Sequence, residues 1–229
     1  MTPKLKQTRA RSEDKKADQR ERILEAGKEL FLKKGSQGFS MRNLAEMLGM
    51  TKNNLYNYVE SKRELWIAIR NKFYSQFKEE NLKIIENHEG SRCDLIVKLY
   101  GHFLDFANRD YDKFKMMFNV VEAPPSNKIG PIEKTYKEFR LLDGTTKLIQ
   151  EAIRAGEITK NSTSLLSLFT YSLVMGVGYV QMMRSEEQYA PSPVWETIQL
   201  SQVDVSYETY KKYTLKVLDY ILKDGSFKT

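Results

Sequence analysis

The stretch "SMRNLAEMLGMTKNNLYNYVESKREL", residues 40–65, decides the fold of this chain. It contains two short apolar patterns of helical spacing, and a hydroxyl residue precedes each of them. Ser40 and Thr51 are typical N-caps, because a side-chain oxygen there can accept a backbone N–H of the first helical turn. Gly49 lies between the two patterns, where a left-handed helix end favours glycine. This order of residues predicts a helix-turn-helix.

The second helix of this motif begins with polar residues, which is unusual for a helix that packs in a core. Lys52, Asn53 and Asn54 are consecutive, and each can form hydrogen bonds. In a helix-turn-helix such residues meet base edges, where Asn pairs with adenine and Lys bonds guanine or phosphate. Tyr56 and Tyr58 can offer hydroxyls to phosphates, or either ring can be a half-buried surface aromatic. The pattern predicts DNA contact, although helix pairs of other kinds also fit it.

The positive charge of the chain is concentrated in its N-terminal third. Residues 1–72 carry 17 Lys and Arg against 9 Asp and Glu, a net +8, and the rest carries 20 against 21, a net −1. This asymmetry favours an anionic partner for the part that holds the motif. Residues 1–18 are almost free of apolar side chains, so we expect a disordered basic arm. Such an arm either touches DNA or only helps to keep the chain in solution.

Helical periodicity continues through the rest of the 229 residues. We expect a first helix over residues 20–34, which Gly35 and Gly38 end, and a long helix that Ser61 begins. Further helices are expected over residues 92–108, 111–121, 129–155, 162–185 and 206–223. Because the alternation typical of strands is scarce, the sequence predicts an all-α fold of about nine helices.

No arrangement of residues typical of an active site is present. The chain has two histidines and one cysteine, and neither His88 nor His102 has a metal-ligand spacing to Cys93. Gly-rich phosphate loops and nucleophile elbows do not occur. We therefore expect a protein without metal or cofactor that is not an enzyme. A lone cysteine and the absence of a signal-peptide pattern suit a cytoplasmic protein.

The uncharged stretch over residues 164–183 raises the question of a membrane helix. Polar residues interrupt its apolar run, and basic residues flank both ends, at Lys160 and Arg184. We therefore expect a buried helix and no membrane contact. A basic membrane-associated or scaffold protein, without sequence-specific DNA binding, is the alternative function.

The run "RILEAGKELFLKKGSQGFSMRNLAEMLGMTKNNLYNYVESKRELW", residues 22–66, resembles the N-terminal domain of the TetR family of transcriptional repressors. The matching features are the Ala-Gly and Leu-Phe of the first helix, the Gly before Phe-Ser, "NLAEMLGMT" and "LYNYVESKREL". The resemblance implies a three-helix DNA-binding domain over residues 19–66, behind the basic arm of 1–18. It also implies a larger helical domain for effector binding and dimerisation over residues 67–229.

The resemblance assigns roles in DNA binding to individual residues. Ser40 stands where a hydroxyl binds phosphate, and Arg42 where a side chain can reach a base or the backbone. Tyr56 and Lys62 match positions that contact DNA, mostly its backbone, and Tyr58 stands where His or Tyr is common. The expected DNA contacts are Ser40, Arg42, Thr51, Lys52, Asn53, Asn54, Tyr56, Tyr58 and Lys62.

For the larger domain, the resemblance implies an effector pocket and a dimer interface. Aromatic and Met side chains suit a pocket for a small, largely apolar or aromatic effector, although most such residues in helical proteins are plain core. The expected pocket residues are Phe73, Phe77, Phe103, Phe106, Met117, Phe118, Tyr171, Met175 and Tyr179. The expected dimer-interface residues are Leu168, Val180, Tyr210, Val217 and Ile221.

These expectations combine into one hypothesis for function. A homodimer binds a palindromic operator in double-stranded DNA and represses transcription until the effector releases it. The residues themselves do not distinguish repression from activation, and they do not name the effector or the operator.

Overall fold

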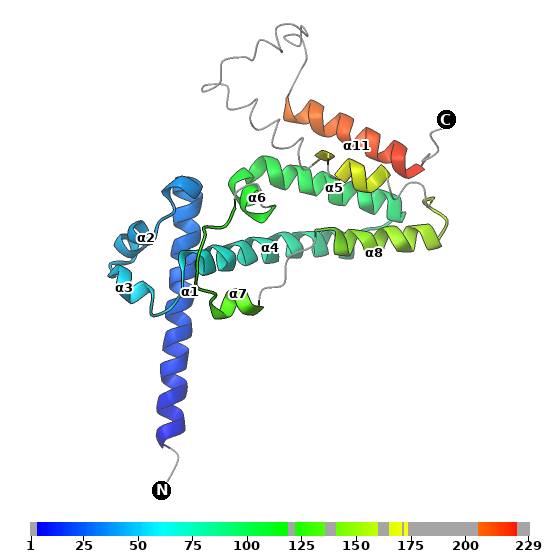
Figure 1. Cartoon of the computed structure of the whole chain (residues 1–229). Helices are drawn as coiled ribbons and strands as arrows, with labels where there is room; N and C mark the ends of the chain where they lie inside the picture. Colours follow the sequence, from blue (N-terminus) through cyan, green and yellow to red (C-terminus); the bar gives the residue numbers. More distant parts are fainter. Residues whose placement is uncertain are drawn as a thin grey trace, which may run out of the picture. The chain divides into compact units, whose positions relative to one another are not determined.

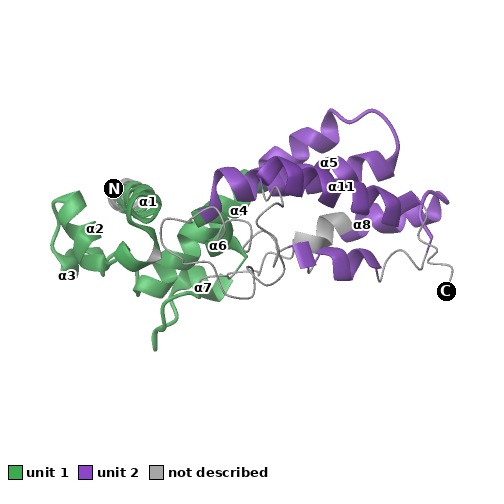
Figure 2. Cartoon of the chain, turned by 90° about the horizontal axis from the view of Figure 1, so that it is seen from above, with its two compact units in different colours: residues 1–77, 112–139 green, residues 78–111, 140–229 purple. Residues whose placement is uncertain are grey.

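The computed structural model describes the backbone over residues 4–118, 122–135, 141–159, 165–170, 172–173 and 206–223. Every regular element in these ranges is a helix (Figure 1), which confirms the predicted all-α class. The chain divides into two compact units (Figure 2), which are described separately below. The first unit comprises residues 1–77 and 112–139, and the second comprises residues 78–111 and 140–229.

Helix α1 (Lys4–Gly38) opens the first unit. The sequence predicts a disordered arm over residues 1–18, and the structure differs, because the helix already begins at Lys4. Between Lys4 and the predicted start of the helix there is no Gly or Pro, and residues of high helix propensity predominate, which favours the continuation. Gly35 has φ 63° and ψ −170°, so the regular helix is interrupted at one of the two predicted glycines.

Two short helices, α2 (Met41–Leu48) and α3 (Lys52–Leu55), form the predicted helix-turn-helix. They are joined through Gly49, whose φ of 62° and ψ of 32° are left-handed. The absence of a Cβ makes this conformation accessible to glycine at little cost, so the predicted role of Gly49 is confirmed.

An aromatic cluster forms the core of the first unit, where α1 meets α4 (Lys62–Glu86). The ring centroid of Phe31 lies 5.2 Å from that of Trp66 and 6.4 Å from that of Phe39. Phe73 completes the cluster at 6.2 Å from Phe31. Edge-on and tilted pairs of this kind add about 0.5–1.5 kcal/mol each beyond the burial of their surface. The cluster therefore fixes α1 and the first part of α4 as the support of the helix-turn-helix.

Close backbone approach and buried leucines attach the motif to this support. A Cβ added to Gly27 on α1 would lie 3.0 Å from the side chain of Ile69, so glycine lets α1 and α4 approach closely. Leu44 of α2 and Leu55 of α3 are fully buried. Burying a leucine side chain contributes roughly 1.5–3 kcal/mol. These contacts hold α2 and α3 against the core by one face only.

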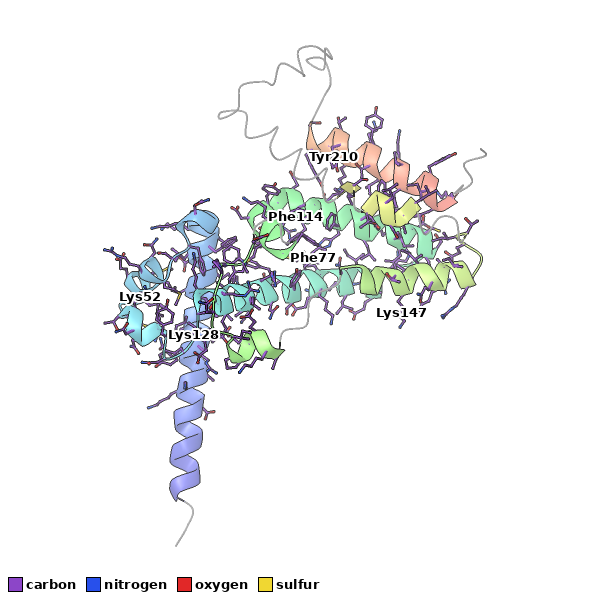
Figure 3. All side chains as sticks on the ribbon, in the orientation of Figure 1. Lys52, Phe77, Phe114, Lys128, Lys147 and Tyr210 are labelled. Carbon is purple, nitrogen blue, oxygen red and sulfur yellow. The ribbon has the colours of Figure 1, made fainter. Side chains whose placement is uncertain are left out.

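The first unit also contains α6 (Tyr111–Met117), from residue 112 onward, and α7 (Pro131–Thr135). The hydroxyl of Tyr74 on α4 donates to the backbone carbonyl of Met117. Phe114 is buried on α6, as Phe77 is on α4 (Figure 3). Helix α7 lies beside the first part of α4 (Figure 1), to which its backbone is hydrogen-bonded.

Of the single helix predicted over residues 129–155, residues 136–140 lie outside the described residues. On either side of them the structure has α7, which ends at Thr135, and α8 (Leu141–Arg154), and residues 129 and 130 are not helical. Helix α7 begins at Pro131, and proline is favoured at the first helical position because its missing N–H has no partner there. The contacts of this short helix with α4 are described below.

The second unit is built around α5 (Arg92–Arg109), which packs against α8 and α11 (Tyr207–Lys223). The carboxylate of Asp105 on α5 accepts hydrogen bonds from Lys211 Nζ and Tyr207 Oη, each at 2.6 Å. Helices were predicted over residues 92–108 and 206–223, so these two predictions are confirmed to within a residue at each end.

Of the helix predicted over residues 162–185, only 165–170 and 172–173 are described, and both pieces are helical. The remainder of the uncharged stretch lies outside the described residues. Within the part of the chain that is described, no helix is both long enough and apolar enough to span a membrane.

Candidate nucleic-acid interface

Each helix of the motif begins at one hydroxyl N-cap, as predicted. Ser40 Oγ accepts the backbone N–H of Asn43 at 3.1 Å, and Thr51 Oγ1 accepts that of Asn54 at 3.2 Å. Each such cap stabilises its helix by about 1 kcal/mol. Because these hydroxyls use oxygen lone pairs for the caps, each O–H remains available as a donor to a phosphate.

The polar residues at the start of α3 are presented to solvent. Lys52, labelled in Figure 3, is exposed together with Asn53 and Asn54, whereas Leu55 directly after them is fully buried. The buried leucine fixes the helix, so the three preceding side chains project from the surface in a defined order. This arrangement can present one ammonium and two amide groups to the edges of bases.

Asn57 lies near Lys52, Asn53 and Asn54 in the sequence, which gave Asn57 itself no role. Its Nδ2 atom donates to Oδ1 of Asn54 at 3.3 Å, and its side chain is exposed. The bond limits the orientations of the Asn54 amide before any partner arrives. The spacing of three residues on a helical turn was the signal that could have indicated this pair.

The two tyrosines occupy different environments. Tyr56 is exposed, and Lys52 Nζ lies 6.0 Å from the centroid of its ring. Tyr58 is half-buried, and its backbone carbonyl accepts a hydrogen bond of 3.0 Å from Nε of Arg20 on α1. Arg20 therefore fixes the turn that follows α3, a role that its place in a basic run did not reveal.

Arg42 and Glu46 form an ion pair on the outer face of α2. Arg42 Nε lies 3.0 Å from Glu46 Oε1, and the two side chains are 84% and 64% exposed. An ion pair so exposed contributes about 0–1 kcal/mol, so Arg42 can exchange Glu46 for a phosphate at little cost.

Lys62 is half-buried, unlike the exposed residues at the start of α3. Its Nζ atom lies 5.5 Å from the ring centroid of Phe39, and burial lowers the pKa of the ammonium group. The side chain thus packs on the aromatic core while its backbone begins α4. A substitution of Lys62 affects core packing as well as surface charge.

Most of the residues expected to line an effector pocket are buried where the structure describes them. In the first unit Phe73, Phe77 and Met117 are buried and Phe118 is half-buried, and in the second unit Phe103 and Phe106 are buried. Tyr171, Met175 and Tyr179 lie outside the described residues. Among the described residues there is also no cluster of side chains that could hold a metal ion.

The residues expected in a dimer interface divide between the surface and the core. Leu168 is 64% exposed and Val217 is 50% exposed, but Ile221 is buried within its own chain. Ile221 therefore packs in the core of the second unit. Tyr210 is half-buried, and Val180 lies outside the described residues.

Two exposed tyrosines that were not predicted lie on the same helix as Val217. Tyr213 is 58% exposed and Tyr220 is 48% exposed. With Val217 they follow the helical spacing of four and three residues along α11, which places all three on one face. We call these three residues the α11 face.

Residues 23–69 match the family model of the bacterial regulatory proteins of the tetR family. The match includes α2 and α3 together with parts of α1 and α4. It covers the expected DNA contacts from Ser40 to Lys62.

Two characterised bacterial regulators are similar in sequence. The HTH-type transcriptional regulator QacR of Staphylococcus aureus is 31% identical over 166 residues, which cover 69% of this chain and 83% of QacR. The HTH-type transcriptional repressor NemR of Escherichia coli is 26% identical over 88 residues, which cover 38% of this chain. That second match spans 44% of NemR, less than half of its length.

Solved structures share the fold. A transcriptional regulator of the TetR/AcrR family from Thermobifida fusca has a TM-score of 0.53 and 20% identity, over 88% of this chain and 97% of that one. A possible TetR family regulator from Streptomyces coelicolor has a TM-score of 0.55 and 15% identity, over 87% and 96%. The match to the family model and the 31% identity to QacR, over 83% of that protein, show that the chain belongs to the TetR family of bacterial regulatory proteins.

Proposed function

We propose that this chain is a homodimeric repressor that acts in the cytoplasm and leaves a palindromic operator when a small effector binds. The observation that carries the DNA-binding part is the exposed row of Lys52, Asn53 and Asn54 in front of the buried Leu55. A rigid helix end with one ammonium and two amides suits the major groove, where Asn reads adenine and Lys reads guanine.

The residues around this row suit contact with the DNA backbone. Ser40 and Thr51 retain hydroxyl donors, and Tyr56 presents an exposed ring and hydroxyl. Arg42 can leave its solvent-exposed partner for a phosphate, and Lys62 marks the start of α4. Such contacts fix the register of the protein on the duplex, while base contacts supply the specificity.

The α11 face supports the proposal of a homodimer. Three large apolar or aromatic side chains at helical spacing are exposed there, and Leu168 is another exposed apolar residue of the second unit. A twofold dimer would present two copies of α3 to half-sites about 34–36 Å apart, or a multiple of that distance. Because a twofold axis relates the two recognition helices, the operator would be palindromic.

Helix α4 supports the proposal that an effector controls DNA binding. It is continuous from Lys62 to Glu86, and it contributes residues to both compact units. We propose that a largely apolar or aromatic effector enters the aromatic and Met-rich helical domain and shifts α4. It would do so by binding better to the form in which the two DNA-binding units do not fit the operator.

The effector part is tested by linkage between two ligands. A collection of small aromatic compounds is screened for those that raise the melting temperature of the full chain. A compound that does so should weaken operator binding, and the operator should weaken binding of the compound by the same factor. Equal operator affinity with and without a saturating compound of this kind would contradict the proposed coupling.

A further inference from the structure

The start of α4 contains a buried carboxylate that joins two distant parts of the first unit. Glu64 is 2% exposed. Its Oε2 atom accepts the backbone N–H of Glu60 at 2.7 Å, and its Oε1 atom accepts that of Ile132 at 2.9 Å. One side chain therefore connects the turn in front of α4 to residues 130–133, which we call the 130–133 segment.

Glycine is required at position 130 by this contact. A Cβ atom added to Gly130 would lie 2.0 Å from Glu64 Oε1 and 2.1 Å from the carboxyl carbon. The φ angle of Gly130 is not positive, so the requirement comes from space and not from backbone conformation. The carboxylate can make room only by giving up a hydrogen bond, and a buried donor left without its acceptor is costly.

Two further hydrogen bonds stabilise the start of α4. Arg63 Nε donates to Glu133 Oε1 at 2.6 Å, and the Glu133 side chain is only 15% exposed, so solvent screens this pair less than a surface pair. The backbone N–H of Glu64 donates to Ser61 Oγ at 3.0 Å. Adjacent residues of α4 thus hold adjacent residues of the 130–133 segment.

We infer that Glu64 is a positioning residue for DNA binding, acting through the turn over residues 56–61. The backbone of this turn is held at Tyr58 by Arg20 and at Glu60 by Glu64. The turn follows the recognition residues of α3 directly. Loss of the Glu64 contact removes a side-chain hydrogen bond that ties this turn to α4, and it leaves α3 less firmly oriented.

Through the same contact, the position of the 130–133 segment affects DNA binding. A displacement of this segment pulls on the carboxylate of Glu64 and so on the N–H of Glu60, without touching any residue that faces DNA. The inference rests on the proposed recognition of an operator, and it does not depend on the nature of the effector.

The experiment compares Gly130→Ala and Glu64→Gln in the full chain. Gly130→Ala crowds the carboxylate, and Glu64→Gln replaces one acceptor oxygen by an NH₂ group. Each should weaken binding to a selected operator duplex by about tenfold and leave binding to a shuffled duplex within about twofold. The double variant should be no worse than the stronger single variant, because both changes break one contact.

Matched controls separate this effect from general ones. Gly101→Ala introduces a Cβ at an ordinary 3.6 Å from Leu215, and Glu79→Gln removes an exposed carboxylate from α4. Both controls should bind like the wild type. The inference would be overturned if the variants at positions 64 and 130 melt like the wild type and keep its preference for the operator over the shuffled duplex. Equal losses on both duplexes would overturn it too, because they indicate a merely structural role.

Amide hydrogen exchange tests the contact directly, including the case in which Glu64→Gln does not fold. In the wild type the N–H of Glu60 should be protected, and Gly130→Ala should remove that protection although the two positions are far apart in sequence. Persistent protection of Glu60 would overturn the inference. A wild type that shows no preference for any duplex would instead contradict the proposed function.

Discussion

Asn53 and Asn54 are the side chains most directly able to read sequence. Replacing either by Ala removes an amide that can pair with a base, while the Thr51 cap and the buried Leu55 stay in place. We expect each variant to lose about 1–3 kcal/mol of discrimination at one base pair of the half-site. Competition between the operator and its single-base variants measures this loss.

Asn127→Ala is the control, because Asn127 is an exposed amide in a loop outside the helix-turn-helix. It should bind every duplex like the wild type. If Asn53→Ala and Asn54→Ala weakened all duplexes alike and kept the base preference, their assignment to base reading would be wrong.

We expect Glu46 to oppose DNA binding, because it is an exposed carboxylate of α2 that pairs with Arg42. Glu46→Gln removes the negative charge and leaves Arg42 without a competing partner. We expect affinity for any duplex to rise about twofold to fivefold at low salt, with the gain vanishing as salt increases. Glu89→Gln, in an exposed position of the second unit, should show no such gain in the same titration.

The sequence predicted residues whose roles depend on near neighbours. The Ser40 and Thr51 caps bond backbone groups three residues away, so the local order of residues was enough to assign them. Arg20 and Glu64 act on partners 38 and 68 residues away, at Tyr58 and Ile132. Such pairs arise only when the chain folds back on itself, and no local pattern indicates them.

At the scale of elements, the turn between α2 and α3 sets where recognition residues lie. Nothing lies within 4 Å of a Cβ built on Gly49, so substitution there carries only a conformational cost. Gly49→Ala should lower the free energy of unfolding by about 1 kcal/mol, because its φ of 62° is left-handed. Gly49→Asn should cost less, since Asn tolerates this region better. Denaturant unfolding that gave both variants the same stability would contradict this account.

The start of α4 should contribute to binding of the DNA backbone through Lys62. Lys62→Ala should weaken all duplexes alike and reduce the slope of log K against log salt by about 0.9, the effect of one phosphate. Lys78→Ala, an exposed lysine farther along α4, should leave the slope unchanged. Because Lys62 packs on Phe39, the melting temperature must be measured beside the affinity. A change of sequence preference in Lys62→Ala would contradict the assignment.

The ends of elements were predictable where capping and periodicity decide them. Helix α5 differs from its predicted range by one residue at its end. The helix predicted from residue 129 begins only at Pro131. Helix α7 is held at Ile132 and Glu133 by α4, through long-range contacts that no local pattern indicates.

At the scale of the whole molecule, the proposed recognition of a palindrome requires a dimer. Val217→Asp places a carboxylate in the middle of the α11 face, so a partner would have to bury an unpaired charge. We expect the variant to fold and to sediment as a monomer. It should lose at least about tenfold in operator affinity, because one dimer no longer binds both half-sites at once.

Asn87→Asp is the matched control, since it also adds one negative charge at an exposed position of the second unit but lies outside α11. This variant should remain a dimer and bind the operator. If Val217→Asp also remained a dimer with full operator affinity, the α11 face would not be the interface.

The sequence predicted the all-α class and the helix-turn-helix, because the TetR-like run from residue 22 to 66 is long and ordered. It did not separate interface from core on the last helix, where Val217 is exposed but Ile221 is buried. Both positions are aliphatic, and only the packing of α11 on α5 decides which face remains outside. The sequence did not separate pocket residues from core residues either, because the helical pattern of aromatic side chains is the same in both.

The central claim is that two copies of this chain read one palindrome. The most direct test is selection of bound duplexes from a random pool by the full-length protein, followed by sequencing. We predict inverted half-sites whose centres are about 34–36 Å apart, or a multiple of that distance, with their base preference relaxed by Asn53→Ala or Asn54→Ala. A selected pool without inverted symmetry, or one that remains as random as the starting pool, would contradict the account.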